Sequence, residues 1–269
     1  AIAVLYGSVT EAPTASPAPT SHWFEGTLVA YYPFDGGNAT DAFGSSDGDL
    51  YLKDSSASSL PVTPGKDGGD AIELDPSDDP EQSDYVELPT TATAAITGDG
   101  ARTICLWLRV DEWKENANVL DYGHENGDSF ELSLGEDEGD LIVYARANDT
   151  YISINGTVDW AYWHHYCLTY DSDVGMAFFF DGQKAAAWDP GTLETGSYYG
   201  LRLGVDVYGN DHLRGAFDEL YIYESALSEE AIAVLYGSVT EAPTASPAPT
   251  SHWFEGTLVA YYPFDGGNA

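Results

Sequence analysis

Apolar and polar residues alternate along most of this chain, which is the pattern of β-strands with one buried face. Residues 101–110 are typical, because they place Ile104, Leu106, Leu108 and Val110 on the same side. Gly, Asp and Pro residues separate the alternating runs. We therefore predict strands at 28–34, 85–88, 101–110, 118–122, 129–134, 141–146, 164–170, 176–181, 201–205 and 215–223.

Many short strands joined by turns predict an all-β fold in which two antiparallel sheets form a sandwich. Residues 135–140, Gly-Glu-Asp-Glu-Gly-Asp, read as a hairpin turn. One short C-terminal helix follows Ser228, whose side chain is a good N-cap. Ile232, Leu235 and Tyr236 form the apolar stripe of this helix, and Gly237 ends it.

Residues 1–39 recur without a mismatch as residues 231–269. A period of 230 residues predicts a tandem array of whole domains, from which this chain is an excerpt. We expect residues 1–7 to be the last helix of a preceding repeat, 8–26 a Pro/Thr/Ser linker, 27–237 the complete domain, 238–256 the next linker and 257–269 the next first strand. The alternative is a swap, in which residues 258–264 replace 28–34 in this domain.

The formal net charge is −36, and the duplicated end contributes three carboxylates, which leaves −33 for one repeat. Such a charge disfavours nucleic acid and anionic membranes as partners. Aromatic residues make up 13% of the chain, more than a disordered acidic segment carries. No apolar run is long enough to insert in a membrane.

Several patterns favour an extracellular, glycosylated protein. Asn38, Asn148 and Asn155 each begin an N-glycosylation motif. The linker is rich in Ser, Thr and Pro, which is typical of O-glycosylated stalks. Its candidate O-glycosylation sites are Thr10, Thr14, Ser16, Thr20 and Ser21.

The ordered segments resemble the laminin G-like, concanavalin A-type jelly-roll domain, and particularly its pentraxin-related members. The residues that carry the resemblance are Leu-Val-Ala-Tyr-Tyr-Pro-Phe-Asp at 28–35, Thr-Ile-Cys-Leu-Trp-Leu at 103–108, Trp-His-His-Tyr-Cys-Leu at 163–168 and Gly-Ala-Phe-Asp-Glu-Leu-Tyr-Ile-Tyr at 215–223. The similarity covers nearly the whole domain and implies a jelly-roll sandwich.

The resemblance also implies a disulfide between Cys105 and Cys167, because pentraxins link their corresponding strands. Two cysteines in an extracellular sandwich are expected to pair. Two buried free thiols are the alternative.

Family members often bind a structural calcium between the loop after the first strand and an Asp near the C-terminus. Carried over to this chain, the resemblance points to Asp41 and Asp218, followed by Asp35, Asn38 and Asp47. The Gly-rich acidic loop supplies the hard oxygen ligands that Ca²⁺ requires. A solvated acidic loop without metal is the alternative.

Catalytic patterns are weak in this sequence. Glu131 and residues 136–138 offer carboxylates, but the latter lie in the predicted turn, where a solvated loop is favoured. His164 and His165 are neighbours in a predicted strand, so they face opposite sides of the sheet and cannot chelate one ion together. We therefore expect no enzyme.

Two functional classes remain. The first and favoured one is a non-catalytic repeat of an extracellular filament or surface appendage, whose partners are neighbouring copies of itself. The second is a multivalent, lectin-like protein that binds glycans on exposed aromatic rings. The candidate rings are Tyr151, Trp160, Tyr162, Trp188, Tyr198 and Tyr199.

Overall fold

The computed structural model describes residues 27–66, 68–76, 83–123, 129–145, 148–154 and 158–237. The predicted terminal helix at 1–7, both linkers and the predicted strand at 257–269 lie outside the described residues. Leu28–Tyr32, the first described strand, pairs with the last strand of the same domain.

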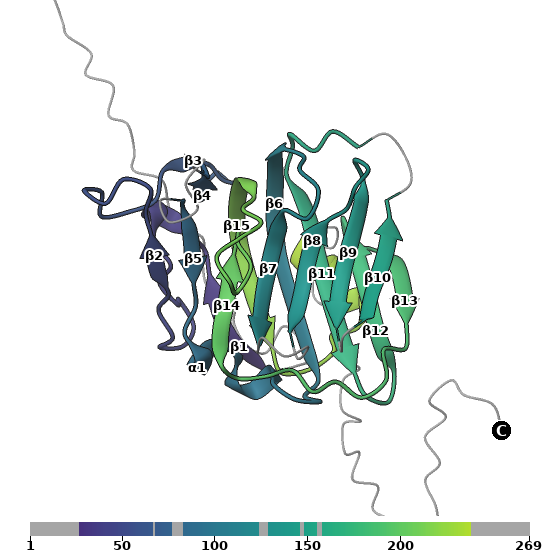
Figure 1. Cartoon of the computed structure of the whole chain (residues 1–269). Coiled ribbons are helices and arrows are strands. Elements are labelled where there is room, and N and C mark those ends of the chain that lie inside the picture. The colour runs from purple at the N-terminus through teal and green to yellow at the C-terminus, as the bar shows by residue number, and fades with distance from the viewer. Residues whose placement is uncertain are drawn as a thin grey trace, which may run out of the picture.

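Two antiparallel sheets pack face to face, as the alternation predicts (Figure 1). Sheet A runs in the order β13 (Gln183–Trp188), β12 (Gly175–Phe180), β11 (His164–Asp171), β6 (Arg102–Glu112), β15 (Arg214–Tyr223), β4 (Asp70–Leu74) and β3 (Val62–Pro64). β1 (Leu28–Tyr32) also pairs with β15, beyond the stretch of β15 that pairs with β4.

Sheet B faces the viewer in Figure 1, with β2 on the left and β10 on the right. Its order is β10 (Asn148–Ser153), β9 (Asp140–Ala145), β8 (Phe130–Leu134), β7 (Asn118–Gly123), β14 (Tyr199–Leu203), β5 (Tyr85–Glu87) and β2 (Asp49–Tyr51). The main core lies between the sheets and is made of their inward-facing residues. Among these, Leu108, Leu120, Leu132 and Phe217 are at most 1% exposed.

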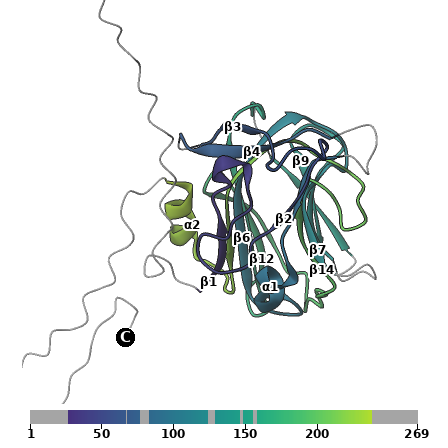
Figure 2. The ribbon, with the colours of Figure 1, turned by 90° about the vertical axis from the view of Figure 1, so that its left-hand side faces the viewer.

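The C-terminal helix is present as α2 (Glu229–Tyr236), which lies on the outer side of sheet A (Figure 2). The Ser228 side chain accepts a hydrogen bond from the Ala231 N–H, and Gly237 ends the helix in a left-handed conformation. Ile232 is fully buried, and the Tyr236 ring stacks on Trp107 of β6. The predicted cap, stripe and stop of this helix are therefore confirmed.

The structure adds elements that the pattern did not predict. α1 (Thr90–Thr93) and the 3-10 turns η2 (Asp35–Gly37) and η4 (Ala94–Ile96) accompany α2, so α2 is not the one helix of the domain. β2, β3, β4, β10 and β13 were also missed. β13 reads Gln-Lys-Ala-Ala-Ala-Trp and lies at an edge of sheet A, where no residue of the strand is fully buried. An edge strand of this kind needs no alternation to be stable.

Candidate functional site

The outward face of sheet B carries a row of polar side chains. Leu50, Val86, Leu201 and Leu132 point into the core, so the residues next to them in each strand point out. The pairing register aligns these outward residues across neighbouring strands. In order from β2 to β9 the row is Asp49, Glu87, Arg202, Asp121, Glu131 and Tyr144.

At the β2 and β5 end of this face lies a pocket of about 310 Å³, which we call the tyrosine pocket. Its lining residues are Tyr51, Leu52, Ser83, Tyr85, Arg202, Tyr208 and Gly209. Tyr51 and Tyr85 are cross-strand partners, and their rings stack with centroids 4.2 Å apart. Tyr51 is 41% exposed and Tyr208 is 55% exposed, so two ring surfaces are open to a ligand.

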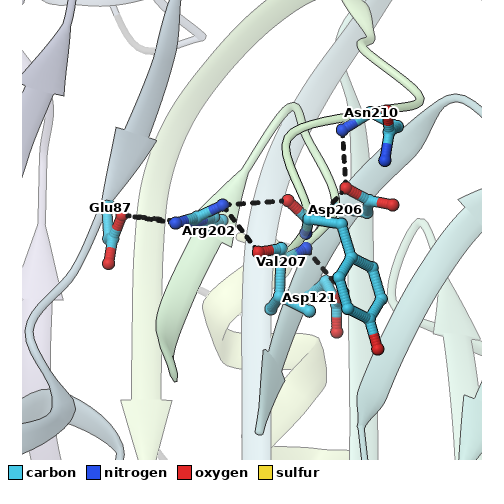
Figure 3. A network of polar contacts seen from close by, with 7 residues as sticks. Glu87, Asp121, Arg202, Asp206, Val207 and Asn210 are labelled. Atoms are coloured by element: carbon cyan, nitrogen blue, oxygen red, sulfur yellow. Dashed lines mark hydrogen bonds and ion pairs between the residues drawn. The ribbon is translucent and has the colours of Figure 1, made fainter. Parts of the chain in front are cut away.

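Arg202 of β14 connects β5 to the loop that carries Tyr208 (Figure 3). Its guanidinium donates to the Glu87 carboxylate on β5 and to the backbone carbonyls of Asp206 and Val207. The guanidinium carbon also lies 5.6 Å from the centre of the Tyr85 ring. Because this cation is already shared among these acceptors, it orients the pocket and supplies little net positive charge to it.

The loop that carries Tyr208 is held by the neighbouring strand. Val207 N–H donates to Asp121 Oδ2 at 2.9 Å, and Asp206 Oδ1 accepts from the N–H groups of Tyr208 and Asn210 (Figure 3).

Burial raises the pKa of Tyr85 to about 12, although Arg202 opposes the shift. Tyr85 is therefore a neutral, polarisable ring at ordinary pH.

The five residues expected to bind calcium do not come together. Asp41 Oδ1 accepts from the N–H groups of Tyr31, Phe43 and Gly44, and its Oδ2 accepts from Ser46 N–H. Asp47 accepts from Asp41 N–H. The carboxylates of Asp41 and Asp47 therefore accept hydrogen bonds from the backbone of their own loop and stabilise its conformation.

Asp35 and Asp218 both contact the segment 65–70 between β3 and β4, which also carries Asp70, a residue that was not predicted. Asp35 Oδ1 accepts from Asp70 N–H, and Asp218 Oδ2 accepts from Lys66 N–H. Burial, Glu219 and Asp35 raise the pKa of Asp218 to about 8. A Cβ on Gly65 would lie 2.6 Å from Asp218 Oδ2, and one on Gly69 would lie 2.7 Å from Asp35 Oδ1, so the turn between β3 and β4 cradles both carboxylates.

The remaining predicted ligand, Asn38, is exposed, and its side chain donates to the Asp35 carbonyl. Its exposure leaves it accessible as a glycosylation site. The Asn148 side chain, Asn155 and the five linker hydroxyls lie outside the described residues.

Cys105 and Cys167 form the predicted disulfide, which confirms this pairing. They are cross-strand partners in β6 and β11, in a second apolar cluster between sheet A and α2. His165 lies fully buried next to Cys167, whereas His164 points to the other side and contacts Asp181 and Phe180. The two histidines therefore face opposite sides, as expected.

The carboxylates and aromatic rings named from the sequence are scattered. Residues 136–138 are exposed in the turn between β8 and β9, and Glu131 is half-buried in the polar row. Tyr151, Tyr162 and Tyr198 are each more than 65% exposed, Trp160 is buried, and Trp188 and Tyr199 are half-buried. Sequence reasoning missed the tyrosine pocket because three separate segments build it. The only available signal was the outward position of Tyr85 in its strand.

Comparisons with known proteins agree with this architecture. Residues 80–233 match a laminin G-type family model described as the concanavalin A-like lectin/glucanases superfamily. No curated protein sequence matches the chain significantly. None of the described helices is long and apolar enough to cross a bilayer.

Among solved structures, domain 4 of AbnA, an extracellular arabinanase from Geobacillus stearothermophilus solved with arabinotriose, is similar at 19% identity and a TM-score of 0.61. The match covers 78% of this chain and 98% of that domain. The botulinum neurotoxin DC binding domain, solved with rat synaptotagmin II, is similar at 11% identity and a TM-score of 0.57. This match covers 78% of this chain and 51% of that one. At these identities the similarity shows a shared fold.

Proposed function

Because the chain belongs to the concanavalin A-like lectin/glucanases superfamily, we propose that this domain is a non-catalytic module that binds a neutral carbohydrate in the tyrosine pocket. The pocket itself is the observation that carries the proposal. Concave sites with aromatic walls and a few fixed polar groups are typical of small-ligand binding. Tyr51 and Tyr208 offer ring faces for the C–H side of a sugar, and the Arg202 guanidinium offers a polar contact.

A neutral sugar fits the charge of this surface better than an acidic one. The chain carries −36 overall, and the polar row beside the pocket contains four carboxylates, those of Asp49, Glu87, Asp121 and Glu131. Arg202 is the one guanidinium of the pocket, and Glu87 already pairs with it. An anionic glycan would therefore meet net repulsion.

The proposal is tested on a glycan array with the 269-residue chain, followed by calorimetric titration of the best neutral oligosaccharide. Tyr208→Ala and Tyr51→Ala should each weaken binding by about tenfold, which corresponds to about 1.4 kcal/mol. Tyr162→Ala is the matched control, since Tyr162 is 68% exposed and lies outside the pocket. Equal affinity of all three variants and the wild type would count against the pocket.

The 39-residue duplication supports a tandem array in which every copy presents one pocket. Linked pockets would raise the avidity for a multivalent glycan without any new contact. The disulfide fits the oxidising, extracellular setting in which surface glycans occur. A purely structural filament is the competing proposal, carried by the same duplication, and it requires self-association and no sugar binding.

We also propose a structural calcium held by Asp35 and Asp218, with Asp70 as a further ligand. Carboxylate oxygens are what Ca²⁺ prefers. Burial raises the pKa of Asp218, and the charges of Glu219 and Asp35 add to the shift, so a bound cation would favour its charged form. Calcium should raise the melting temperature of the wild type. Asp218→Asn should remove most of this rise, and it should melt above the wild type in chelator at pH 8, because the buried charge is gone. A calcium shift that survives Asp218→Asn unchanged would reject this ligand set.

A further inference from the structure

A β-bulge in β7 points two polar side chains out of sheet B. The register with β8 shifts between Asn118 and Leu120, so that one extra residue fits on the β7 side. Val119 and Leu120 therefore both point into the core, where each is at most 1% exposed. Asn118 and Asp121 flank them and point to the outer face. Bulges often re-aim side chains at functional sites.

The segment 206–211 closes over these two side chains. Val207 N–H donates to Asp121 Oδ2 at 2.9 Å (Figure 3). Asn118 N–H donates to the Asp211 carbonyl at 2.7 Å. As a result Asp121 is only 2% exposed and Asn118 is fully buried. Both are polar groups that the fold has removed from water.

Each of these side chains keeps one buried oxygen without a partner among the described residues. Asp121 Oδ1, Asn118 Oδ1 and His212 Nδ1 are buried and have no hydrogen-bond partner among the described residues. A buried polar group without a partner destabilises a fold. All three atoms lie in or beneath residues 206–212. This grouping favours a bound cation at this position.

The surrounding charge is negative. Glu131 is the direct cross-strand neighbour of Asp121, and one of its oxygens accepts from the Ser133 hydroxyl. Asp206 and Asp211, in the segment 206–211, carry further negative charge close to this pair.

Arg202 offsets the charge of this cluster only in part. It is the cross-strand neighbour of Asp121 on the side away from Glu131 and lowers the pKa of Asp121, which burial raises. Its hydrogen bonds, however, go to Glu87 and to the carbonyls of Asp206 and Val207. Asp121 and Glu131 are therefore paired across β7 and β8 without a hydrogen bond from this guanidinium.

We propose that Asp121, Glu131 and Asn118 bind a calcium ion beneath the 206–211 segment. Two carboxylates and an amide carbonyl form a hard oxygen set of the kind that Ca²⁺ takes, and water can complete the shell. The ion would fix the segment that presents Tyr208 to the tyrosine pocket. The site is on the outer face of sheet B, whereas Asp218 lies in β15 of sheet A and Asp35 in η2, so the two calcium proposals are independent.

The test is a calorimetric calcium titration of the 269-residue chain in the Asp218→Asn background, where the other proposed site is disabled. One calcium should still bind in this background. Adding Asp121→Asn should weaken that binding at least tenfold, and so should adding Glu131→Gln, which alters a half-buried group and is the safer change for folding. Glu136→Gln, in the exposed turn, is the control and should leave the binding unchanged.

Two results would overturn the proposal. The first is the absence of calcium binding in the Asp218→Asn background, while circular dichroism shows a folded chain. The second is calcium binding that neither Asp121→Asn nor Glu131→Gln weakens.

Discussion

His165 is the buried residue that most clearly ties the stability of this domain to pH. Its side chain is fully buried between Trp107 and Tyr236, and burial lowers its pKa from 6.5 to about 3, with Lys66 adding to the shift and Asp181 opposing it. As the pH falls below 6.5, the unfolded chain binds a proton at this imidazole and the folded chain does not. Stability is therefore present above pH 6.5 and is lost as the pH falls toward 3, by about 1.4 kcal/mol per pH unit at most.

His165→Phe should remove this contribution, because a phenyl ring keeps the aromatic packing and binds no proton. Urea unfolding between pH 4 and pH 7 measures the effect as a shallower dependence of the free energy of unfolding on pH. His164→Phe is the matched comparison, because the pKa of His164 is raised: burial lowers it, but the hydrogen bonds and charges of Asp181 and Asp159 together raise it by more. Parallel pH profiles for His165→Phe and the wild type would show that the buried imidazole does not carry the acid sensitivity.

At the scale of elements, the disulfide joins two central strands of sheet A. Cys105 in β6 and Cys167 in β11 are 62 residues apart in the sequence, so the bond restricts a long loop in the unfolded chain. Replacing both with Ala should lower the free energy of unfolding by about 4 kcal/mol on the chain-entropy estimate. Chemical denaturation of the double variant checks this value. A loss below 1 kcal/mol would mean that packing under α2 holds these strands without the bond.

Alternation was enough to predict the central strands, because a strand with one face in the core must place apolar residues at every second position. It could not find β13 or β2, which lie at sheet edges and bury little. The disulfide was predictable because each cysteine sits in a strong strand pattern. The tyrosine pocket was not, since it depends on the register between β2 and β5 and on the fold of the segment around Tyr208.

Hydrogen bonds in the loop after β1 separate the carboxylates that the sequence predicts as calcium ligands. Asp35, Asn38, Asp41 and Asp47 are neighbours in the sequence, but the loop turns Asp41 toward its own backbone N–H groups. Asp70, a residue that no sequence pattern singled out, comes to Asp35 through the turn between β3 and β4. Carboxylates that are close in sequence therefore have different partners: Asp41 accepts from N–H groups of its own loop, and Asp35 accepts from the Asp70 N–H.

At the scale of the whole molecule, two sheets enclose one core, and the proposed binding site lies on the outer face of sheet B. The C-terminal helix covers the outer side of sheet A (Figure 2). Sheet B has the tyrosine pocket, the polar row and the proposed cation site on its outer face. The central claim of the proposed function is that carbohydrate binds on the outer face of sheet B and not on sheet A or α2.

The most direct test of that claim is a nuclear magnetic resonance titration of the folded chain with its best neutral oligosaccharide. We predict that shifts in the backbone and tyrosine ring signals centre on Tyr51, Tyr85 and Tyr208, with Arg202 among the affected residues. Signals from sheet A and α2, including Trp107 and Tyr236, should stay in place. Shifts centred on sheet A or on α2, or no shifts with any neutral oligosaccharide at millimolar concentration, would contradict the account.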